Sequence, residues 1–493
     1  MSFTSVFFLI VFLPVSVLCH YFAKEKYRNI WLVFVSIAFY FWAGLSFLVI
    51  LLASALVAYG IGLGIGKVKK IAGKRALLGV GLVFHIGVLF YFKYLFTAIT
   101  YFLAVVKYTG HTMTIDFTSP LLPLGISFYT FSMISYIVDV YWEKVKVNRN
   151  FGIALLYFSF FPRVVQGPIM RYSDFEGQLQ GRQVTEEMLY HGIERFIIGM
   201  AKKLIIADQL VKVVDYAFDN SGAIGTAPAW IGILAYLLQL YFDFSGYSDM
   251  ALGLGSMFGF KLPENFRYPY LSASCAEYWR RWHISLGEWL RDYVYMPMSR
   301  TLLSKKWIAK SKNPMMLCDI CALFVTWVVT GIWHGSKLQF LAHGMWWFAF
   351  IAFERVRDAK RKKRRKAKKL PVKKNSVIQN IGDHALTLFA IVFGQVLFRA
   401  NGLRAALSYW KTMLTASQPD GIVWLLVLTN SALVAFFLGI VFCFPIYPWL
   451  MKRKCMQYKG VQAIYSVLLV ILFILAFAYA VSAGYTPFLY QVF

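Results

Sequence analysis

The chain has 493 residues, of which 59% are hydrophobic and only 15% carry charge, whereas about a quarter of the residues in a soluble domain are charged. This composition excludes a large soluble domain and predicts a membrane protein, since a spanning helix needs roughly 20 apolar residues. The net charge of +28 is concentrated in loops: residues 354–374 hold 13 Lys and Arg against two carboxylates, a net +11. Basic loops between apolar runs indicate cytoplasmic orientation and contact with anionic lipids, not nucleic-acid binding.

Apolar runs follow one another along the chain and predict an all-α, polytopic fold. In chain order they are residues 3–19, 30–64 (long enough for two helices), 76–106, 121–141, 151–161, 193–206, 229–244, 315–333, 338–353, 386–398, 422–450 and 464–481. Some are too short to cross about 30 Å of hydrocarbon; the run at 151–161 climbs only about 16 Å as a helix. We therefore expect about eleven spanning helices, with short re-entrant and interfacial helices around a central tunnel.

The sequence predicts a single integral membrane domain. Its parts are N-terminal helices (1–120), a motif-bearing catalytic core (121–354), a basic cytoplasmic loop (355–374) and C-terminal helices (375–493). Counting crossings between basic loops places both termini, Met1 and Phe493, outside the cytoplasm. High charge and few apolar residues predict that the basic loop is mobile or bound to headgroups. The six cysteines have neither a disulfide framework nor zinc spacing, so no bound metal is expected.

Four polar and aromatic blocks interrupt the apolar pattern, at residues 123–141, 160–175, 241–270 and 276–297. The candidates for lining a substrate tunnel are Ser127, Tyr129, Gln166, Arg171, Asp243, Ser245, Asp249, Trp279, Arg281, Trp282 and Trp333. The two aspartates either relay protons, as in a transporter, or form a buried pair satisfied by nearby hydroxyls. Ser127, Ser245 and Cys275 lack the sequence context of a catalytic nucleophile.

Two histidines have distinctive settings. Block 276–297 is predicted to form one interfacial helix with tryptophans and leucines on one face and charges on the other, and His283 lies on its apolar side. His334 follows the apolar run at 320–333, which climbs about 21 Å. It should therefore lie within the membrane thickness, where an ionisable residue is a functional candidate. His85, His343 and His384 are better explained as packed or interfacial histidines.

The same blocks resemble the membrane-bound O-acyltransferase family, in its bacterial cell-envelope branch of alginate-type O-acetyltransferases and teichoic-acid D-alanyl transfer proteins. The matching segments are PLGISFYTF at Pro123, FFPRVVQGPIMR at Phe160, FDFSGYSDMALGLG at Phe242, ENFRYPY at Glu264, EYWRRWHISLGEWLRDYVY at Glu277 and TGIWHG at Thr330. The resemblance covers residues 1–354, and the C-terminal third by hydropathy alone. It implies that His334 is the invariant histidine of the family and that His283 occupies its second position, asparagine or histidine. Departures after Tyr295 (MPMSRTLLSKK) and after WHG (SKLQFLAHGMW) leave the acceptor and acyl group open.

The resemblance implies an O-acyltransferase of the bacterial cytoplasmic membrane. It would move an acyl group, with acetyl favoured, from an acyl-CoA or acyl-carrier-protein thioester to hydroxyls of an envelope or exported polysaccharide, directly or through an extracytoplasmic partner. No cofactor besides the donor is expected. His334 would act as general base, and His283 would orient the acceptor or donate to the oxyanion. D-Alanyl transfer to teichoic acid stays open within the family; a transporter or flippase of a lipid-linked glycan, or a membrane scaffold, stays open outside it.

Overall fold

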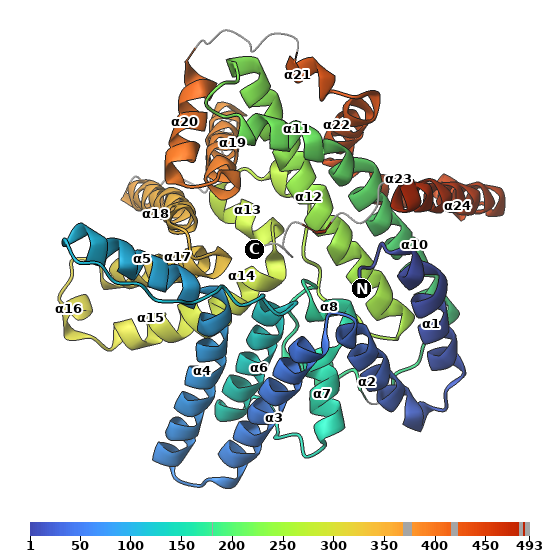
Figure 1. Cartoon of the computed structure of the whole chain (residues 1–493), viewed down its shortest axis with the longest axis horizontal. Coiled ribbons are helices and arrows are strands. Elements are labelled where there is room, and N and C mark those ends of the chain that lie inside the picture. Colours follow the sequence, from blue (N-terminus) through green and yellow to red (C-terminus); the bar gives the residue numbers. More distant parts are fainter. Residues whose placement is uncertain (180, 368–376, 416–422, 483–486, 489–493) are drawn as a thin grey trace. The chain divides into compact units, whose positions relative to one another are not determined.

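The computed structural model describes residues 1–179, 181–367, 377–415, 423–482 and 487–488. Within these ranges all named elements are helices, and the only β-type pairing is an isolated bridge between Phe266 and Trp282 (Figure 1). The predicted all-α fold is confirmed. The chain divides into two compact units, the first formed by residues 1–201, 246–263 and 467 onward, the second by residues 202–245 and 264–466.

The first unit is built from the N-terminal half of the chain. Its helices are η1 (Phe8–Phe12), α1 (Leu13–Phe22), α2 (Glu25–Phe41), α3 (Leu45–Lys67), α4 (Ile71–Lys93), α5 (Leu95–Tyr108), α6 (Ile126–Tyr141), α7 (Phe151–Ser159), α8 (Phe161–Val164), α9 (Tyr172–Glu176) and α10 (Glu186–Ala201), with the end of α12 (Thr226–Met257) and the later part of α24 (Lys459–Ser482). Helices α3, α4 and α6 pack side by side (Figure 1). Helix α7 has nine residues, so the half-length helix predicted there is confirmed.

Glycines bring two helices of the first unit into backbone contact. A Cβ on Gly192 of α10 would lie 2.7 Å from the carbonyl oxygen of Gly253 on α12, and a Cβ on Gly199 would lie 2.5 Å from that of Gly246. No larger residue fits at these crossings. The glycine-rich stretch of the third block therefore serves helix packing.

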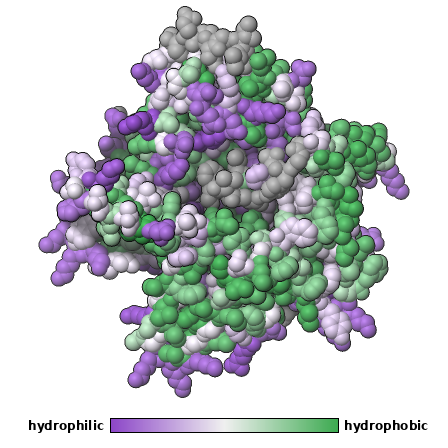
Figure 2. Space-filling view, in the orientation of Figure 1, coloured by the Kyte–Doolittle hydropathy of each residue, from purple (hydrophilic) through white to green (hydrophobic). Residues whose placement is uncertain are grey.

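The surface of the first unit carries the apolar character that the composition predicts. Over α2, α3 and α7 the visible face is mostly apolar, whereas hydrophilic side chains gather at the turn that joins α3 to α4 (Figure 2). Lys69 and Lys70 lie in that turn and are exposed. This distribution is typical of helices that cross lipid and end at its interface.

The second unit contains the remaining elements. They are η2 (Lys202–Ala207), α11 (Asp208–Asp219), the start of α12, η3 (Pro269–Leu271), α13 (Cys275–Arg281), α14 (Ile284–Leu290), η4 (Arg291–Tyr295), α15 (Met296–Leu303), α16 (Lys306–Ala309), α17 (Pro314–His334), α18 (Leu338–Ala367), α19 (Val377–Arg399), α20 (Leu403–Leu414), α21 (Val423–Leu426), α22 (Asn430–Phe442), α23 (Ile446–Met451), η5 (Lys454–Gln457) and the start of α24. Helices α17, α18 and α19 pack in sequence.

The described residues include six helices long and apolar enough to cross a membrane: α3, α4, α12, α17, residues 379–399 of α19, and α24. Their burial differs widely, because 78% of the most apolar window of α12 is buried but only 11% of that of α24. Three shorter apolar helices cover residues 8–22, 95–108 and 430–442. Helix α12 thus forms part of the protein interior, while α24 presents apolar side chains outward.

The basic segment begins differently from the prediction. Helix α18 continues through the charged stretch as far as Ala367, so residues 355–367 are not a loop. Lys, Arg and Ala are good helix formers, and the apolar first half of α18 provides a nucleated helix that they extend. The rest of the predicted loop, residues 368–374, and the C-terminal Phe493 lie outside the described residues.

Candidate active site

His334 is the last residue of α17 and is 4% exposed. The helix begins at Pro314, after an N-cap in which the side chain of Asn313 accepts a hydrogen bond from the Met316 amide. Gly335 follows His334, and α18 starts three residues later. His334 thus ends the helix formed by the apolar run that precedes it, while its depth within the membrane stays a prediction.

Two glycines set the spacing between α17 and α18. A Cβ on Gly331 would lie 2.7 Å from the carbonyl oxygen of Phe340, and one on Gly344 would lie 2.4 Å from that of Trp327. The two helices therefore form a hairpin in direct backbone contact. This hairpin brings His334 near His343 of α18, with 6.0 Å between their ring centroids.

Aromatic rings surround His334. The ring of Phe398, from α19, lies edge-on at 5.0 Å, and that of Trp333 lies 4.7 Å away. Trp333 also lies 6.2 Å from the ring of His283. The second unit thus brings together the two histidines that the sequence predicts to be catalytic, along with Trp333.

His283 lies between α13 and α14 and is 1% exposed. Its Nδ1 lies 3.2 Å from Oδ1 of Asn265. The same oxygen accepts hydrogen bonds from the amide (3.2 Å) and hydroxyl (2.9 Å) of Ser285. An atom that accepts from a backbone N–H is an acceptor, so Nδ1 of His283 is the donor and carries the proton. Burial lowers the pKa of His283 to about 3, so the ring is neutral, with its lone pair on Nε2.

The prediction of a single interfacial helix for block 276–297 is wrong. The structure breaks this block at Trp282 and His283, whose φ is 46°: α13 ends before the break, and α14 begins after it and continues into η4 and α15. The backbone at the break pairs with an upstream loop: the Arg267 amide donates to the Arg281 carbonyl oxygen (2.9 Å), and the Ile284 amide to that of Asn265 (3.0 Å). These long-range bonds replace helical ones, and Asn265 then caps α14.

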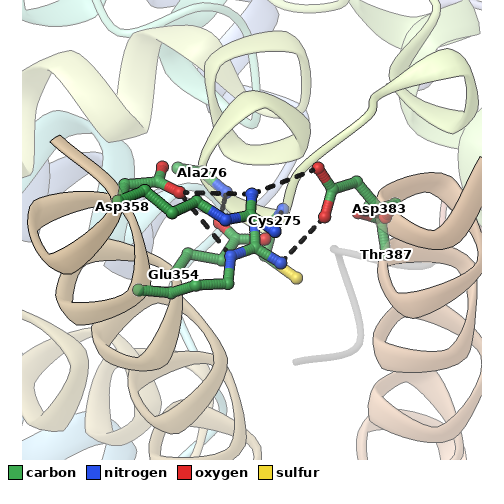
Figure 3. A network of polar contacts seen from close by, with 8 residues as sticks. Cys275, Ala276, Glu354, Asp358, Asp383 and Thr387 are labelled. Carbon is green, nitrogen blue, oxygen red and sulfur yellow. Dashed lines mark hydrogen bonds and ion pairs between the residues drawn. The ribbon is translucent and has the colours of Figure 1, made fainter. Parts of the chain in front are cut away.

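Helix α13 is fixed at its start by two carboxylates. Ser274 and Glu277 form a capping box, in which the Ser274 hydroxyl accepts from the Glu277 amide and the Glu277 carboxylate accepts from the Ala273 amide. Glu354 of α18 is 4% exposed and accepts from the amides of Cys275 (2.7 Å) and Ala276 (3.0 Å) (Figure 3). The helix that ends beside His283 is therefore anchored to the helix that carries His343.

Further ion pairs surround this anchor. Arg357 donates to Asp383 of α19 at 2.8 Å, and Arg361 lies 3.9 Å from both Asp383 and Asp358 (Figure 3).

Burial and the Glu354 charge raise the pKa of the Cys275 thiol well above its usual range. A protonated thiol is a weak nucleophile, so Cys275 is unsuited to covalent catalysis.

Tryptophans form an aromatic cluster around α13. The ring of Trp279 lies 4.8 Å from Trp327 of α17 and 5.2 Å from Trp347 of α18. Trp282 lies 5.0 Å from Phe266. Arg281 is partly exposed and pairs with Glu277 at 2.5 Å. Trp279 and Trp282 thus share the histidine region, whereas Arg281 belongs to the outer side of α13.

Both aspartates have cationic partners, which the sequence alone does not indicate. In the second unit, Asp243 and Asp208 each lie 2.7 Å from Nζ of Lys203, and all three side chains are buried. In the first unit, Asp249 lies 2.9 Å from Arg195. Ser245, which follows Asp243 on α12, is 2% exposed.

The remaining predicted residues belong to the first unit. Ser127 and Tyr129 are buried on α6, and Arg171 lies 3.9 Å from Asp174. Gln166 is fully buried, and neither polar atom of its amide has a hydrogen-bond partner among the described residues. Polar atoms buried in this way are candidates for ligand contact.

Sequence reasoning missed Arg163, in the same block as Gln166. This residue is 4% exposed, donates to the hydroxyl of Ser132 (2.8 Å) and to the carbonyl oxygen of Tyr157, and lies over the Tyr157 ring at 4.4 Å. A charged residue within an apolar run was the available signal. Glu354 was also missed, because its partners lie 78 and 79 residues away. No group of three or more potential metal ligands occurs in the part of the chain that the structure describes.

The described residues thus combine helices with the length and hydropathy of membrane spans with a buried histidine pair at a glycine-mediated helix crossing. The profile of the membrane-bound O-acyltransferase family matches residues 153–398. A probable alginate O-acetylase AlgI of Pseudomonas putida is 38% identical over 84% of this chain and 80% of its own length. A peptidoglycan O-acetyltransferase of Helicobacter pylori is 31% identical over 70% and 68%. A teichoic acid D-alanyltransferase of Bacillus subtilis is 35% identical over 45% and 56%.

The chain belongs to the membrane-bound O-acyltransferase family. It is an integral membrane protein and an acyltransferase. The family resemblance inferred from the six sequence motifs is thus confirmed, and neither a transporter nor a scaffold is supported.

Proposed function

We propose that this acyltransferase moves acetyl groups from a cytoplasmic thioester across the membrane to hydroxyls of a cell-envelope or exported polysaccharide. The observation that carries this proposal is the similarity to the alginate O-acetylase, which extends over 84% of the chain. The peptidoglycan O-acetyltransferase adds a second acetyl-transferring relative. D-Alanyl transfer to teichoic acid is the alternative, favoured by the shorter match to the teichoic acid D-alanyltransferase.

His334 is the proposed general base. A neutral hydroxyl is a poor nucleophile, so a positioned imidazole that takes its proton accelerates attack. The hydroxyl oxygen forms a bond to the acyl carbon while the proton passes to His334. The carbon–sulfur bond then breaks, and the thiolate leaves with that proton. The buried, aromatic setting of His334 supports this role, because it disfavours a charged ring before the reaction.

His283 is proposed to orient the acceptor. With the proton on Nδ1, its Nε2 accepts a hydrogen bond and has no hydrogen to donate. It therefore suits an acceptor hydroxyl better than an oxyanion. Of the two roles that the resemblance implies for this residue, orientation is the one we retain.

The arrangement in the membrane is proposed as follows. The shorter apolar helices complete about eleven crossings, and the aromatic cluster of the second unit lines the tunnel between donor and acceptor. The donor is acetyl-CoA or an acyl-carrier protein, and an extracytoplasmic protein receives the acyl group or presents the glycan. The chain acts in the bacterial cytoplasmic membrane as one catalytic domain, with both termini outside.

The basic end of α18 tests this topology. Its charge is expected to contact anionic headgroups on the cytoplasmic side and to be dispensable for chemistry. Cysteines introduced at Ala367 and near Met1 should react with a membrane-impermeant reagent from opposite sides. Labelling of both from one side would contradict the arrangement.

Transfer of label tests the function. Membranes from the native host that contain the full chain are incubated with cytosol and radiolabelled acetyl-CoA, and the initial rate of label incorporation into polysaccharide is measured. Mild alkali should release the label as acetate, since it is held by an ester. A host lacking the gene should incorporate none, and a host carrying His334→Gln should incorporate label at least about 10²-fold more slowly. Incorporation that persists without the gene would overturn the proposal. In a parallel incubation with labelled D-alanine, incorporation that requires the gene would favour the alternative.

A further inference from the structure

We propose that His343 is a third catalytic histidine, whose Nδ1–H donates a hydrogen bond to the acyl carbonyl oxygen as negative charge develops on it. The proposal rests on the proposed acyl transfer and names the oxyanion donor for that reaction. The sequence predicted only a packed histidine at this position. Three features of the structure carry the inference: the tautomer, the missing partner and the place of the ring.

The tautomer of His343 is set by Trp347, one turn later on α18. The indole Nε1–H of Trp347 donates to Nε2 of His343 at 2.9 Å. An indole nitrogen only donates, so Nε2 must be the nitrogen with the lone pair. In a neutral ring the proton then resides on Nδ1. His343 is 1% exposed, and burial disfavours the doubly protonated form.

This proton on Nδ1 has no hydrogen-bond acceptor in the part of the chain that the structure describes. Among the described residues, Nδ1 of His343 has no hydrogen-bond partner. A buried donor without an acceptor is unfavourable and rare, and a catalytic role is one of the few reasons for keeping one. A carbonyl oxygen of the substrate would satisfy it. The satisfaction would be strongest in the transition state, when the oxygen carries most charge.

The ring lies where such a donor is needed. Its centroid is 6.0 Å from that of His334, and both rings contact Phe398, at 5.2 and 5.0 Å. The glycine crossing of α17 and α18 fixes this spacing through the backbone. A base and an oxyanion donor must both reach one reacting carbon, and two rings this close together can both reach a substrate bound beside them. His283 has no proton on Nε2, so a separate donor is required.

The proposed acyl transfer begins at the acceptor hydroxyl and ends with a free thiol. His334 removes the hydroxyl proton, the new carbon–oxygen bond forms, and the carbonyl π electrons move onto the oxygen, which Nδ1–H of His343 stabilises. When the carbonyl re-forms, the carbon–sulfur bond breaks and the thiolate receives the proton from His334. His343 neither gains nor loses a proton over the cycle.

Two substitutions separate the two nitrogens. In His343→Asn the amide nitrogen replaces the Nδ1 donor, and the acceptor for Trp347 is lost. In His343→Gln the amide oxygen replaces the Nε2 acceptor, and the Nδ1 donor is lost. The initial rate of acetyl transfer per amount of protein is measured in the membrane assay. We expect His343→Asn to stay within about tenfold of wild type and His343→Gln to lose about 10²- to 10³-fold, the usual effect of removing an oxyanion donor.

The order of the two transfer rates distinguishes an oxyanion donor from a packing role for His343. A packing role predicts the reverse order, because only Gln keeps the bond to Trp347; that order, or equal rates in both variants, would overturn the proposal. If neither variant accumulates, Trp347→Phe decides, since it leaves His343 in place, keeps an aromatic ring in the cluster and removes the indole N–H that sets the His343 tautomer. Its rate should fall by a small factor, in proportion to the fraction of the ring in the productive tautomer, and an unchanged rate would refute the idea. His111→Gln, at an exposed position, controls for histidine replacement. Absence of transfer by wild type would instead refute the proposed function.

Discussion

The second unit buries two polar clusters that are stabilised in opposite ways. Lys203 neutralises Asp208 and Asp243 through contacts of 2.7 Å, so one cation serves two acids. His283, His334 and His343 instead lie among aromatic rings, at 4.7 to 5.2 Å from their nearest phenylalanines. Buried charges survive only when paired, whereas a neutral imidazole remains available for proton transfer. The ionic cluster is therefore interpreted as structural and the histidine cluster as chemical.

The largest effect is expected from His334→Gln. Glutamine has a similar size and keeps some hydrogen bonding but accepts no proton, so the acetyl-transfer rate should fall by about 10²- to 10⁴-fold. The variant should accumulate in the membrane at the wild-type level, as measured by immunoblotting. A well-expressed variant with near-normal transfer would remove His334 from the base role.

Lys203→Met should break the ionic cluster instead. It leaves two buried carboxylates without their cation, a change that costs about 3–5 kcal/mol in the free energy of unfolding. The expected result is low accumulation and a lower melting temperature in detergent, with the activity per folded molecule largely retained. A stable variant that is inactive would place this cluster in the chemistry.

The same variant has an expected pH dependence. Burial raises the pKa of Asp208 to about 6, and loss of Lys203 would raise this pKa further. A carboxyl whose pKa is higher in the folded state binds more protons when folded, so it loses stability as the pH rises through that range. Lys203→Met should therefore be more stable below about pH 6 than at pH 7, as followed by thermal unfolding.

His283→Ala is expected to have a smaller effect than His334→Ala. Loss of an orienting group misplaces the acceptor hydroxyl and costs up to about 10²-fold, while a water or a neighbouring donor compensates in part. The loss should appear mainly in the dependence of rate on acceptor concentration. Equal losses in both variants, at normal expression, would indicate a mechanism with two bases.

The smallest of these effects is expected from Glu354→Gln. Glutamine has a single acceptor oxygen and no charge, so it holds only one of the amides of Cys275 and Ala276. The lost charge-assisted bond contributes about 1.5–3 kcal/mol. We expect a lower melting temperature with a modest loss of rate, because α13 is anchored less firmly. Glu186→Gln, at an exposed position in the first turn of α10, is the matched control.

Hydrophobic runs predicted helices well where lipid or the core determines them. Helices α3 and α17 match their runs, and the position of His334 follows from the end of one such run, whereas the run at 76–106 is divided between α4 and α5. The prediction of a loop from residue 355 is wrong, because high charge disfavours burial but not helix, which Lys and Arg favour.

The errors in the site come from contacts between residues distant in the sequence. The break at His283 depends on Asn265, 18 residues upstream, and the ion pair of Asp243 depends on Lys203, 40 residues away. Helical periodicity within one block carries no information about either partner. The setting of His343 depends on a helix crossing, so its sequence alone indicated a packed residue.

The backbone of His283 has a further consequence. Its φ of 46° is left-handed, a conformation that costs non-glycine residues about 1–3 kcal/mol and that asparagine and histidine tolerate better than most. Glycine would relieve this strain. The imidazole is thus held at this position at a cost in backbone strain, and a replacement that removes the strain also removes the ring that packs against Phe244 and that is proposed to orient the acceptor. Stability and turnover are in conflict at a single residue, and any engineering of this enzyme has to screen for both.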